Sequence, residues 1–123
     1  MADKTESGFH FYFDKPTNEL SSEQANFNGH YPFGKAPQGP WLMRTSRVGA
    51  YPPNRLGLCD MHGNVCQWTD TEVKDELGVL SRIIPGGHWA DDSKDCQAAG
   101  HSCVTPTFRH NSLGFRLARV TVR

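Results

Sequence analysis

The stretch Leu56–Trp68, LGLCDMHGNVCQW, decides the fold of this 123-residue chain. Its centre, Asp60–Asn64 (DMHGN), combines Asp, Gly and Asn, the residue types that favour tight turns. Val65–Trp68 then leads into a short predicted strand. Two further anchors lie downstream, Gly86–Trp89 (GGHW) and Leu113–Leu117 (LGFRL). Together these segments predict a scaffold of short strands joined by ordered turns.

Length and composition limit the class of protein. At 123 residues the chain has room for one domain rather than two. The 12 glycines and 8 prolines indicate a loop-rich fold. The formal net charge is zero and no block of Lys or Arg stands out, so the electrostatic signature of a nucleic-acid binder is missing. We predict one minimal domain over residues 9–123, preceded by a disordered segment at 1–8, and no nucleic-acid partner.

The sequence shows neither a secretory signal nor a membrane span. The first residues, MADKTESGFHFYF, lack an apolar core flanked by positive charge, and no apolar run approaches the roughly 20 residues of a spanning helix. We therefore expect a cytoplasmic protein by default, with surface display as the alternative, and no membrane insertion. In the cytoplasm the four cysteines would be free thiols; they are Cys59, Cys66, Cys96 and Cys103.

Short extended segments are expected along the chain. Residues 10–13 and 80–84 are predicted strands, and residues 113–122 alternate in part and are the predicted last strand. Residues 21–27 begin with a Ser cap typical of a helical turn, and the acidic residues 69–78 indicate a connector or a weak helix. The expected fold class is α+β, loop-rich, with short antiparallel strands. The aromatic side chains expected in the core are Tyr12, Phe13, Phe27, Trp41, Trp68 and Phe115.

Five motifs in order resemble the C-terminal half of the formylglycine-generating-enzyme (sulfatase-modifying factor) domain, a variant of the C-type lectin-like fold. Residues 60–65 (DMHGNV) with Gln67-Trp68 resemble the family's D-M-H-G-N-V-W-E-W, and residues 48–54 (VGAYPPN) resemble its V-G-S-x-P-P-N. The helix motif of the family's preceding half has no counterpart here. The resemblance implies a minimal C-type-lectin-like domain or a C-terminal fragment, with a second copy or a partner supplying the missing N-terminal half.

The resemblance implies enzymatic activity only for chains with two cysteines shortly after the Gly-Gly motif. There the oxidase branch of the family holds copper between soft thiolates. Residues 88–95, after Gly86-Gly87, contain no cysteine, and Cys96 matches a separate structural cysteine of non-enzymatic members. We therefore predict a non-catalytic protein and expect no copper. The alternatives are a formylglycine-generating oxidase, a fragment of a related iron-dependent sulfur-transfer enzyme, and a regulatory accessory module of a multidomain protein.

The same resemblance implies a calcium site in the central turn. By motif position its ligands are the side chain of Asp60, the carbonyls of Gly63 and Val65, and the side chain of Gln67. Calcium prefers hard oxygen ligands, and the amide of Gln67 replaces the negatively charged Glu of the family, which weakens the site. An ordinary turn-stabilising role for Asp60 is the alternative, and both stay open.

A zinc site is a further alternative from the residues themselves. Cys59, His62 and Cys66 lie close in the sequence, with Cys96 or Cys103 as a fourth ligand, and thiol and imidazole groups suit zinc. Their spacing matches no recognised zinc-finger pattern. Buried thiols that pack as small apolar groups are the simpler interpretation.

Residues 86–116 form a frame with variable positions between fixed ones. The frame resembles the G-G-S-W-N-N-N … I-G-F-R-L pattern of bacterial and phage variable proteins made by diversity-generating retroelements, in which randomised template adenines convert Asn codons to many others. The resemblance implies that the loops of residues 88–112 bind a protein or another macromolecular ligand, with an ordinary divergent loop as the alternative. The predicted ligand-binding residues are Ala90, Asp91, Asp92, Ser93, Asp95, Gly100, His101, Ser102, Cys103, Val104, Phe108, His110, Asn111 and Ser112.

Overall fold

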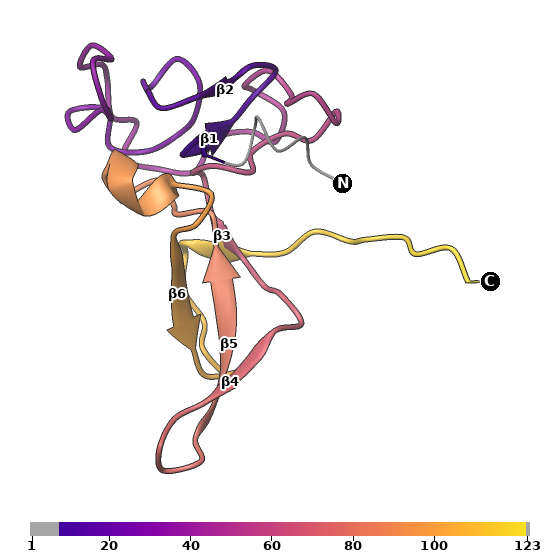
Figure 1. Cartoon of the computed structure of the whole chain (residues 1–123). Helices are drawn as coiled ribbons and strands as arrows, with labels where there is room; N and C mark the ends of the chain where they lie inside the picture. The colour runs from indigo at the N-terminus through magenta and orange to yellow at the C-terminus, as the bar shows by residue number, and fades with distance from the viewer. Residues whose placement is uncertain (1–7, 123) are drawn as a thin grey trace.

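The computed structural model describes residues 8–122. The predicted disorder at the N-terminus falls on residues 1–7, which lie outside the described residues, together with Gly8, which is in a turn. Regular structure in the described part is confined to short strands and one 3-10 helix (Figure 1). In chain order these are β1 (Phe11–Tyr12), β2 (Pro16–Thr17), β3 (Cys66–Gln67), β4 (Glu72–Lys74), β5 (Leu80–Pro85), η1 (Ser93–Cys96), β6 (His101–Val104) and β7 (Leu113–Gly114). None of the helical structure in residues 8–122 is long or apolar enough to cross a membrane.

The strands form three separate small sheets. β1 and β2 make an antiparallel hairpin, and β4, β5 and β6 make an antiparallel sheet that projects as an arm from the loop-rich half of the molecule (Figure 1). β3 and β7 pair in parallel, with Cys66 opposite Leu113. The expected fold named antiparallel strands, and the structure adds this one parallel pair to them. Its partners lie far apart in the sequence, which gives the chain the long connection that parallel pairing requires.

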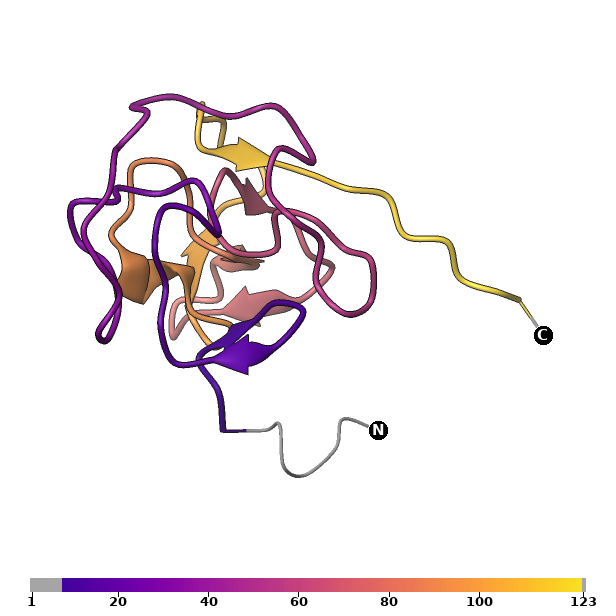
Figure 2. The same ribbon diagram turned by 90° about the horizontal axis from the view of Figure 1, so that it is seen from above.

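Two predicted strands are confirmed as β1 and β5, and three other segments differ from the prediction. Residues 21–27 form turns rather than a helix, and no α-helix occurs in residues 8–122. Residues 69–78 contain β4, because this segment pairs with β5. Residues 113–122 form a strand only at β7, after which the chain continues as an extended tail without further strand pairing (Figures 1 and 2).

The buried apolar core lies in the loop-rich half. Its buried members come from β1, from the loop that follows the N-terminal hairpin and from η1. They are Phe11, Leu20, Ala25, Phe27 and Cys96. Two phenylalanine rings, those of residues 13 and 33, pack against them. Phe27 thus confirms one expected core aromatic. The expectation for Phe115 is wrong, since its side chain is 75% exposed on the tail.

The buried residue Asn64 joins three distant segments to the central turn. Its φ of 66° lies in the left-handed region, which Asn tolerates better than most residues. Its backbone N–H donates to the Asn26 carbonyl at 2.8 Å, and its carbonyl accepts from the Trp89 N–H at 2.9 Å. Its side-chain Oδ1 accepts from the Ser46 N–H at 2.9 Å and from Asn26 Nδ2 at 3.2 Å. The turn therefore satisfies polar groups that would otherwise be buried without partners.

Gly63 allows these segments to approach closely. Its N–H donates to the Gly86 carbonyl at 2.7 Å. A Cβ atom at Gly63 would lie 2.5 Å from the Asn26 carbonyl oxygen, and its φ is +79°. Both features require glycine at this position. The Gly-Gly anchor is therefore held directly on the central turn.

His62 completes the turn as a buried, neutral imidazole. Its Nε2 accepts from the Tyr12 N–H at 3.1 Å, and its Nδ1 lies 2.7 Å from the Cys96 carbonyl, to which it donates. The rings of Phe11 and Phe13 pack against it at centroid distances of 5.4 and 5.2 Å. Burial lowers the pKa of His62, and the hydrogen bond to the Cys96 carbonyl opposes this shift.

We predict that Asn64→Ala lowers the free energy of unfolding by about 3 kcal/mol, because it leaves buried donors of Ser46 and Asn26 without their acceptor. The measurement is urea unfolding followed by fluorescence. Asn111→Ala is the matched control, because Asn111 is exposed and contributes only its backbone carbonyl to a hydrogen bond. The control should change the free energy by less than about 0.5 kcal/mol. Equal losses in the two variants would contradict the role given to Asn64.

We also predict that His62 makes the fold acid-sensitive. Its pKa in the folded state is lowered from the ordinary value of 6.5. The stability that the neutral ring contributes is therefore fully present above about pH 6.5 and is lost as the pH falls toward the folded-state pKa. His62→Gln keeps a donor and an acceptor without a charge change. Its unfolding free energy, measured between pH 7.5 and 5, should fall less steeply than that of the wild type, and parallel curves would rule out this contribution.

Candidate binding surface

The segment between the two anchors begins and ends on the scaffold. It leaves β5 at Gly86, runs through η1 and β6, and returns to β7. Its start is held by the bond from Gly63 to Gly86 already described. At its end the Cys66 N–H donates to the Ser112 carbonyl at 2.8 Å. Both ends are thus fixed by backbone hydrogen bonds to the central turn and β3, as the resemblance implied for a frame.

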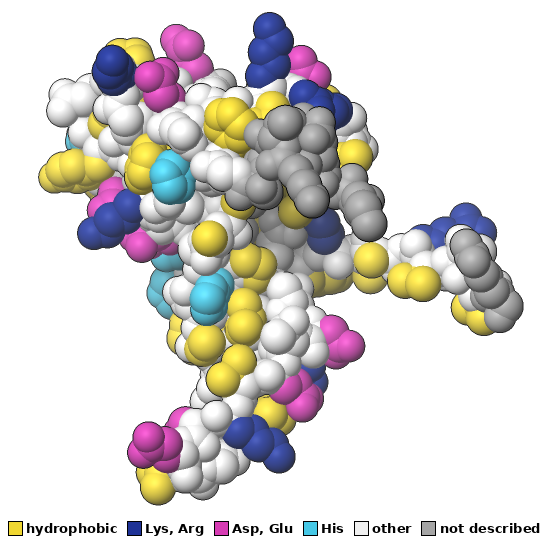
Figure 3. Space-filling view, viewed as in Figure 1, with side chains coloured by type: hydrophobic (Ala, Val, Ile, Leu, Met, Phe, Trp, Pro, Cys, Tyr) yellow, Lys and Arg dark blue, Asp and Glu magenta, His cyan; other side chains and the backbone are white. Residues whose placement is uncertain are grey.

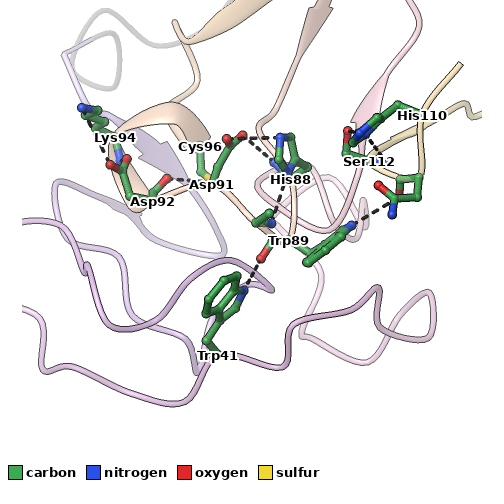
Figure 4. Close-up of polar contacts among 11 residues, drawn as sticks. Trp41, His88, Trp89, Asp91, Asp92, Lys94, Cys96, His110 and Ser112 are labelled. Carbon is green, nitrogen blue, oxygen red and sulfur yellow. Dashed lines mark hydrogen bonds and ion pairs between the residues drawn. The ribbon is translucent and has the colours of Figure 1, made fainter. Parts of the chain in front are cut away.

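Trp89 braces the segment from within. Its indole Nε1 donates to the Asn111 carbonyl at 3.3 Å, which connects the two ends of the segment. Its own carbonyl accepts from the indole of Trp41 at 2.8 Å (Figure 4). Because its backbone N–H is also bonded to Asn64, the partly buried Trp89 is tied to the scaffold at three points.

The acidic side chains after Trp89 mostly bind their own loop. Asp91 receives the His88 N–H at 3.0 Å through Oδ2 and lies 3.2 Å from His88 Nε2 through Oδ1 (Figure 4). Burial raises the pKa of Asp91, and the neighbouring His88 lowers it. Asp92 caps η1 by accepting the Lys94 N–H at 3.2 Å. These carboxylates shape the loop and present only part of their surface to solvent.

Two of the predicted ligand-binding residues face inward. Ser93 is 4% exposed and Ser112 is 7% exposed. The Ser112 hydroxyl lies 2.6 Å from Nδ1 of His110, whose ring stacks on Phe108 at a centroid distance of 5.9 Å. The prediction that all fourteen residues face a ligand is therefore corrected for these two serines.

The remaining predicted residues form what we call the display surface. It consists of loop residues on either side of η1, one η1 residue, the whole of β6 and the loop before β7. Its exposed members are Ala90, Asp95, His101, Ser102, Cys103, Phe108, His110 and Asn111, and its partly exposed members are Asp91, Asp92, Gly100 and Val104. In Figure 3 histidine and hydrophobic side chains gather on the face above the arm.

A polar hollow of about 250 Å³ opens within the display surface. It is lined by His88, Asp91, Lys94, Asp95 and His101, together with uncharged residues of β3, β5 and β6. The sequence did not single out His88 or Lys94. Lys94 cannot be reached from an Asn codon by changing adenines alone, and His88 stands between the fixed residues Gly87 and Trp89 of the frame. His88 and Lys94 reach the hollow only because η1 folds against β6.

Two of the thiols lie inside the scaffold. Cys66 is 5% exposed and Cys96 is fully buried. Burial raises the pKa of the Cys66 thiol to about 11, and burial also raises the pKa of Cys96. Cys59 is partly exposed, Cys103 is exposed, and all four are free thiols, as expected. With their raised pKa values, Cys66 and Cys96 supply little thiolate for metal binding or nucleophilic attack.

The zinc alternative does not fit the structure. Both ring nitrogens of His62 are occupied by hydrogen bonds to backbone groups. Within residues 8–122 no three His, Cys, Asp or Glu side chains converge as a metal site would require. Cys59, His62 and Cys66 therefore serve the fold separately.

An apolar groove lies on another side of the molecule. It has a volume of about 980 Å³ and is lined by Leu58, Met61, Trp68 and Ala118, among others. The tail that forms one wall carries four exposed apolar side chains, which are Phe115, Leu117, Val120 and Val122. From the sequence, these residues are predicted to belong to a strand with one buried face. The alternation of apolar residues breaks after Leu117. A strand through this segment could therefore not direct all four apolar side chains to one face, and this break is visible in the sequence.

The fold and the site define a C-type-lectin-like domain of the formylglycine-generating-enzyme type. Comparison with known proteins agrees. Residues 3–121 match the model of the sulfatase-modifying factor enzyme 1-like domain, and the chain belongs to this family. It is 34% identical over 110 residues to an inactive C-alpha-formylglycine-generating enzyme 2 of Mus musculus. That match covers 82% of this chain and 34% of the relative, so the chain spans about a third of the length of this curated relative.

Solved structures show the same fold. PvdO from Pseudomonas aeruginosa matches with a TM-score of 0.62 and 25% identity, over 87% of this chain and 43% of that one. Treponema denticola variable protein 1 matches with a TM-score of 0.56 and 24% identity, over 76% of this chain and 34% of that one. The second likeness shows the fold alone.

Proposed function

We propose that this chain is a non-catalytic binding module that recognises a protein or another macromolecule through its display surface. The observation that carries the proposal is the separation of roles between Gly87 and Leu113. Trp89, Ser93 and Ser112 are turned into the scaffold, whereas most of the side chains between them are exposed. Loops that vary on a rigid scaffold are the usual carriers of recognition.

The chemistry of the display surface suits recognition. Phe108 stacks on His110 and leaves 39% of its surface exposed, which gives a rigid aromatic contact at low entropic cost. Asp95 and His101 add polar groups at the hollow. A surface that carries both an aromatic contact and polar groups is the arrangement expected of a site that binds a folded partner.

The distribution of thiols favours binding over oxidation. A copper-dependent oxidase of this family needs two accessible cysteines after the Gly-Gly motif. Here Cys96 is buried, and Cys103 stands on the exposed strand β6 without a second exposed thiol within residues 88–112. The similarity to an inactive relative supports the same choice.

We further propose that the display surface varies by the mechanism of diversity-generating retroelements. The fold shared with a variable protein of Treponema denticola and the frame of the sequence support this. The decisive test lies in the genome of origin. A near-copy of the region encoding Ala90–Ser112, differing at adenines and adjoining a reverse transcriptase gene, is expected. Copper- or iron-dependent turnover of a cysteine-containing peptide would overturn the binding proposal.

We predict that the display surface tolerates substitution and its brace does not. A triple variant, Ala90→Ser with His101→Asn and Asn111→Ser, should keep the free energy of unfolding within about 1 kcal/mol, because the three side chains are exposed. Trp89→Ala, a single change in the same segment, should lose about 3 kcal/mol. Thermal and urea unfolding measure both. A triple variant as unstable as Trp89→Ala would show that the exposed residues serve the fold.

We also propose that a second copy of the chain covers the apolar groove and tail. Leu117 is 90% exposed and Val122 is 93% exposed. Several strongly exposed apolar side chains on one segment, next to an apolar groove, are typical of an interface. The expected result is self-association in sedimentation velocity that Leu117→Asp weakens and that Val48→Asp, an exposed change away from the groove, does not. A chain that stays monomeric at high concentration would contradict self-association.

A further inference from the structure

Arg116 directs its guanidinium from the start of the tail into the central turn. Its Nη2 donates to the Cys59 carbonyl at 2.7 Å and to the Asp60 carbonyl at 3.3 Å. Its Nε donates to the side-chain oxygen of Gln67. One cationic side chain therefore contacts two turn carbonyls and an amide oxygen of β3, all of them hard oxygen ligands.

The side chain of Gln67 is fixed by this arrangement. Its Oε1 accepts from Arg116, and its Nε2 donates to the Asp60 carbonyl at 3.1 Å. The amide thus presents N–H donors toward the carbonyl that flanks the expected calcium position. Turning the oxygen of Gln67 toward a metal would break both of these bonds.

The side chain of Asp60 has one oxygen atom that no described hydrogen bond engages. Its φ of 55° is left-handed, and its Oδ2 accepts from the Gly49 N–H at 3.0 Å. Its Oδ1 is buried without a hydrogen-bond partner among the described residues. Calcium takes six to eight oxygen ligands. With the amide of Gln67 engaged, the implied set supplies only this atom and the carbonyls of Gly63 and Val65, which is too few. A divalent ion here would also lie close to the guanidinium, and their repulsion is strong in a partly buried setting.

The residues therefore do not fit the calcium site that the resemblance implied at Asp60, Gly63, Val65 and Gln67. We propose that the guanidinium of Arg116 replaces calcium as the cation that stabilises this turn. The planar, permanently charged group donates to several oxygens at once, which a metal would otherwise do by coordination. Because Arg116 lies two residues after the end of β7, the same contact ties the last strand to the central turn. This inference is independent of the ligand-binding proposal.

The test compares thermal unfolding of the wild-type chain in millimolar calcium chloride and in EDTA. The midpoint is expected to be the same in both, and terbium luminescence should show no saturable site. Arg116→Gln should lower the midpoint by roughly 5 °C, since it removes charge-assisted hydrogen bonds to the carbonyls of the central turn. Arg119→Gln, on the same tail, should leave it unchanged.

A second variant keeps the test decisive if Arg116→Gln fails to fold. Arg116→Lys retains the charge but loses the planar fork, so its midpoint should lie between those of the wild type and Arg116→Gln. Two results would overturn the proposal. One is a wild-type midpoint that rises with calcium and falls with EDTA. The other is an Arg116→Gln variant as stable as Arg119→Gln.

Discussion

The buried turn at His62–Asn64 is the constraint on which the rest of the molecule depends. The described chain has only short strands in three small sheets, so regular hydrogen bonding cannot hold it together. The turn does so instead, by binding backbone groups of the N-terminal hairpin, the loop at Ser46, the Gly-Gly anchor and η1. Since these bonds are buried, losing one leaves an unsatisfied group rather than a solvated one.

This arrangement explains how a small domain can carry an exposed and irregular surface. The scaffold residues of the segment, above all Trp89, are bonded to the central turn and to Trp41. The residues between them contribute little to stability, so they are free to change. Asp91 and Asp92 are intermediate, because they shape their loop while leaving part of each carboxylate exposed. In the proposed binding module, fold and recognition would therefore rest on different side chains of one segment.

Much of the scaffold could be predicted from the sequence, because its signals are local. Gly63, Gly86 and Gly87 all have positive φ, as their place in turn motifs indicated. Arg116, which belongs to the Leu113–Leu117 anchor, binds the backbone carbonyls of Cys59 and Asp60. The core place of Phe115 was predicted wrongly, since an alternating pattern does not reveal whether a strand has a partner.

The candidate site was predictable only in outline. Its boundaries follow from the two anchors, whereas the inward position of Ser93 and Ser112 depends on packing that no codon pattern encodes. The calcium prediction depends on packing in the same way. Gln67 and Arg116 are far apart in the sequence, and only the pairing of β3 with β7 brings the guanidinium to the turn.

The parallel pairing of β3 with β7 has a consequence for how the domain folds. Cys66 and Leu113 enclose the whole display surface, so their pairing closes one long chain loop that contains it. The entropic cost of such a closure grows only slowly with loop length. Contacts at this sequence separation also tend to form late and slowly. The folding barrier should therefore be set by closing the frame, and variants that differ only at the display surface should fold at similar rates.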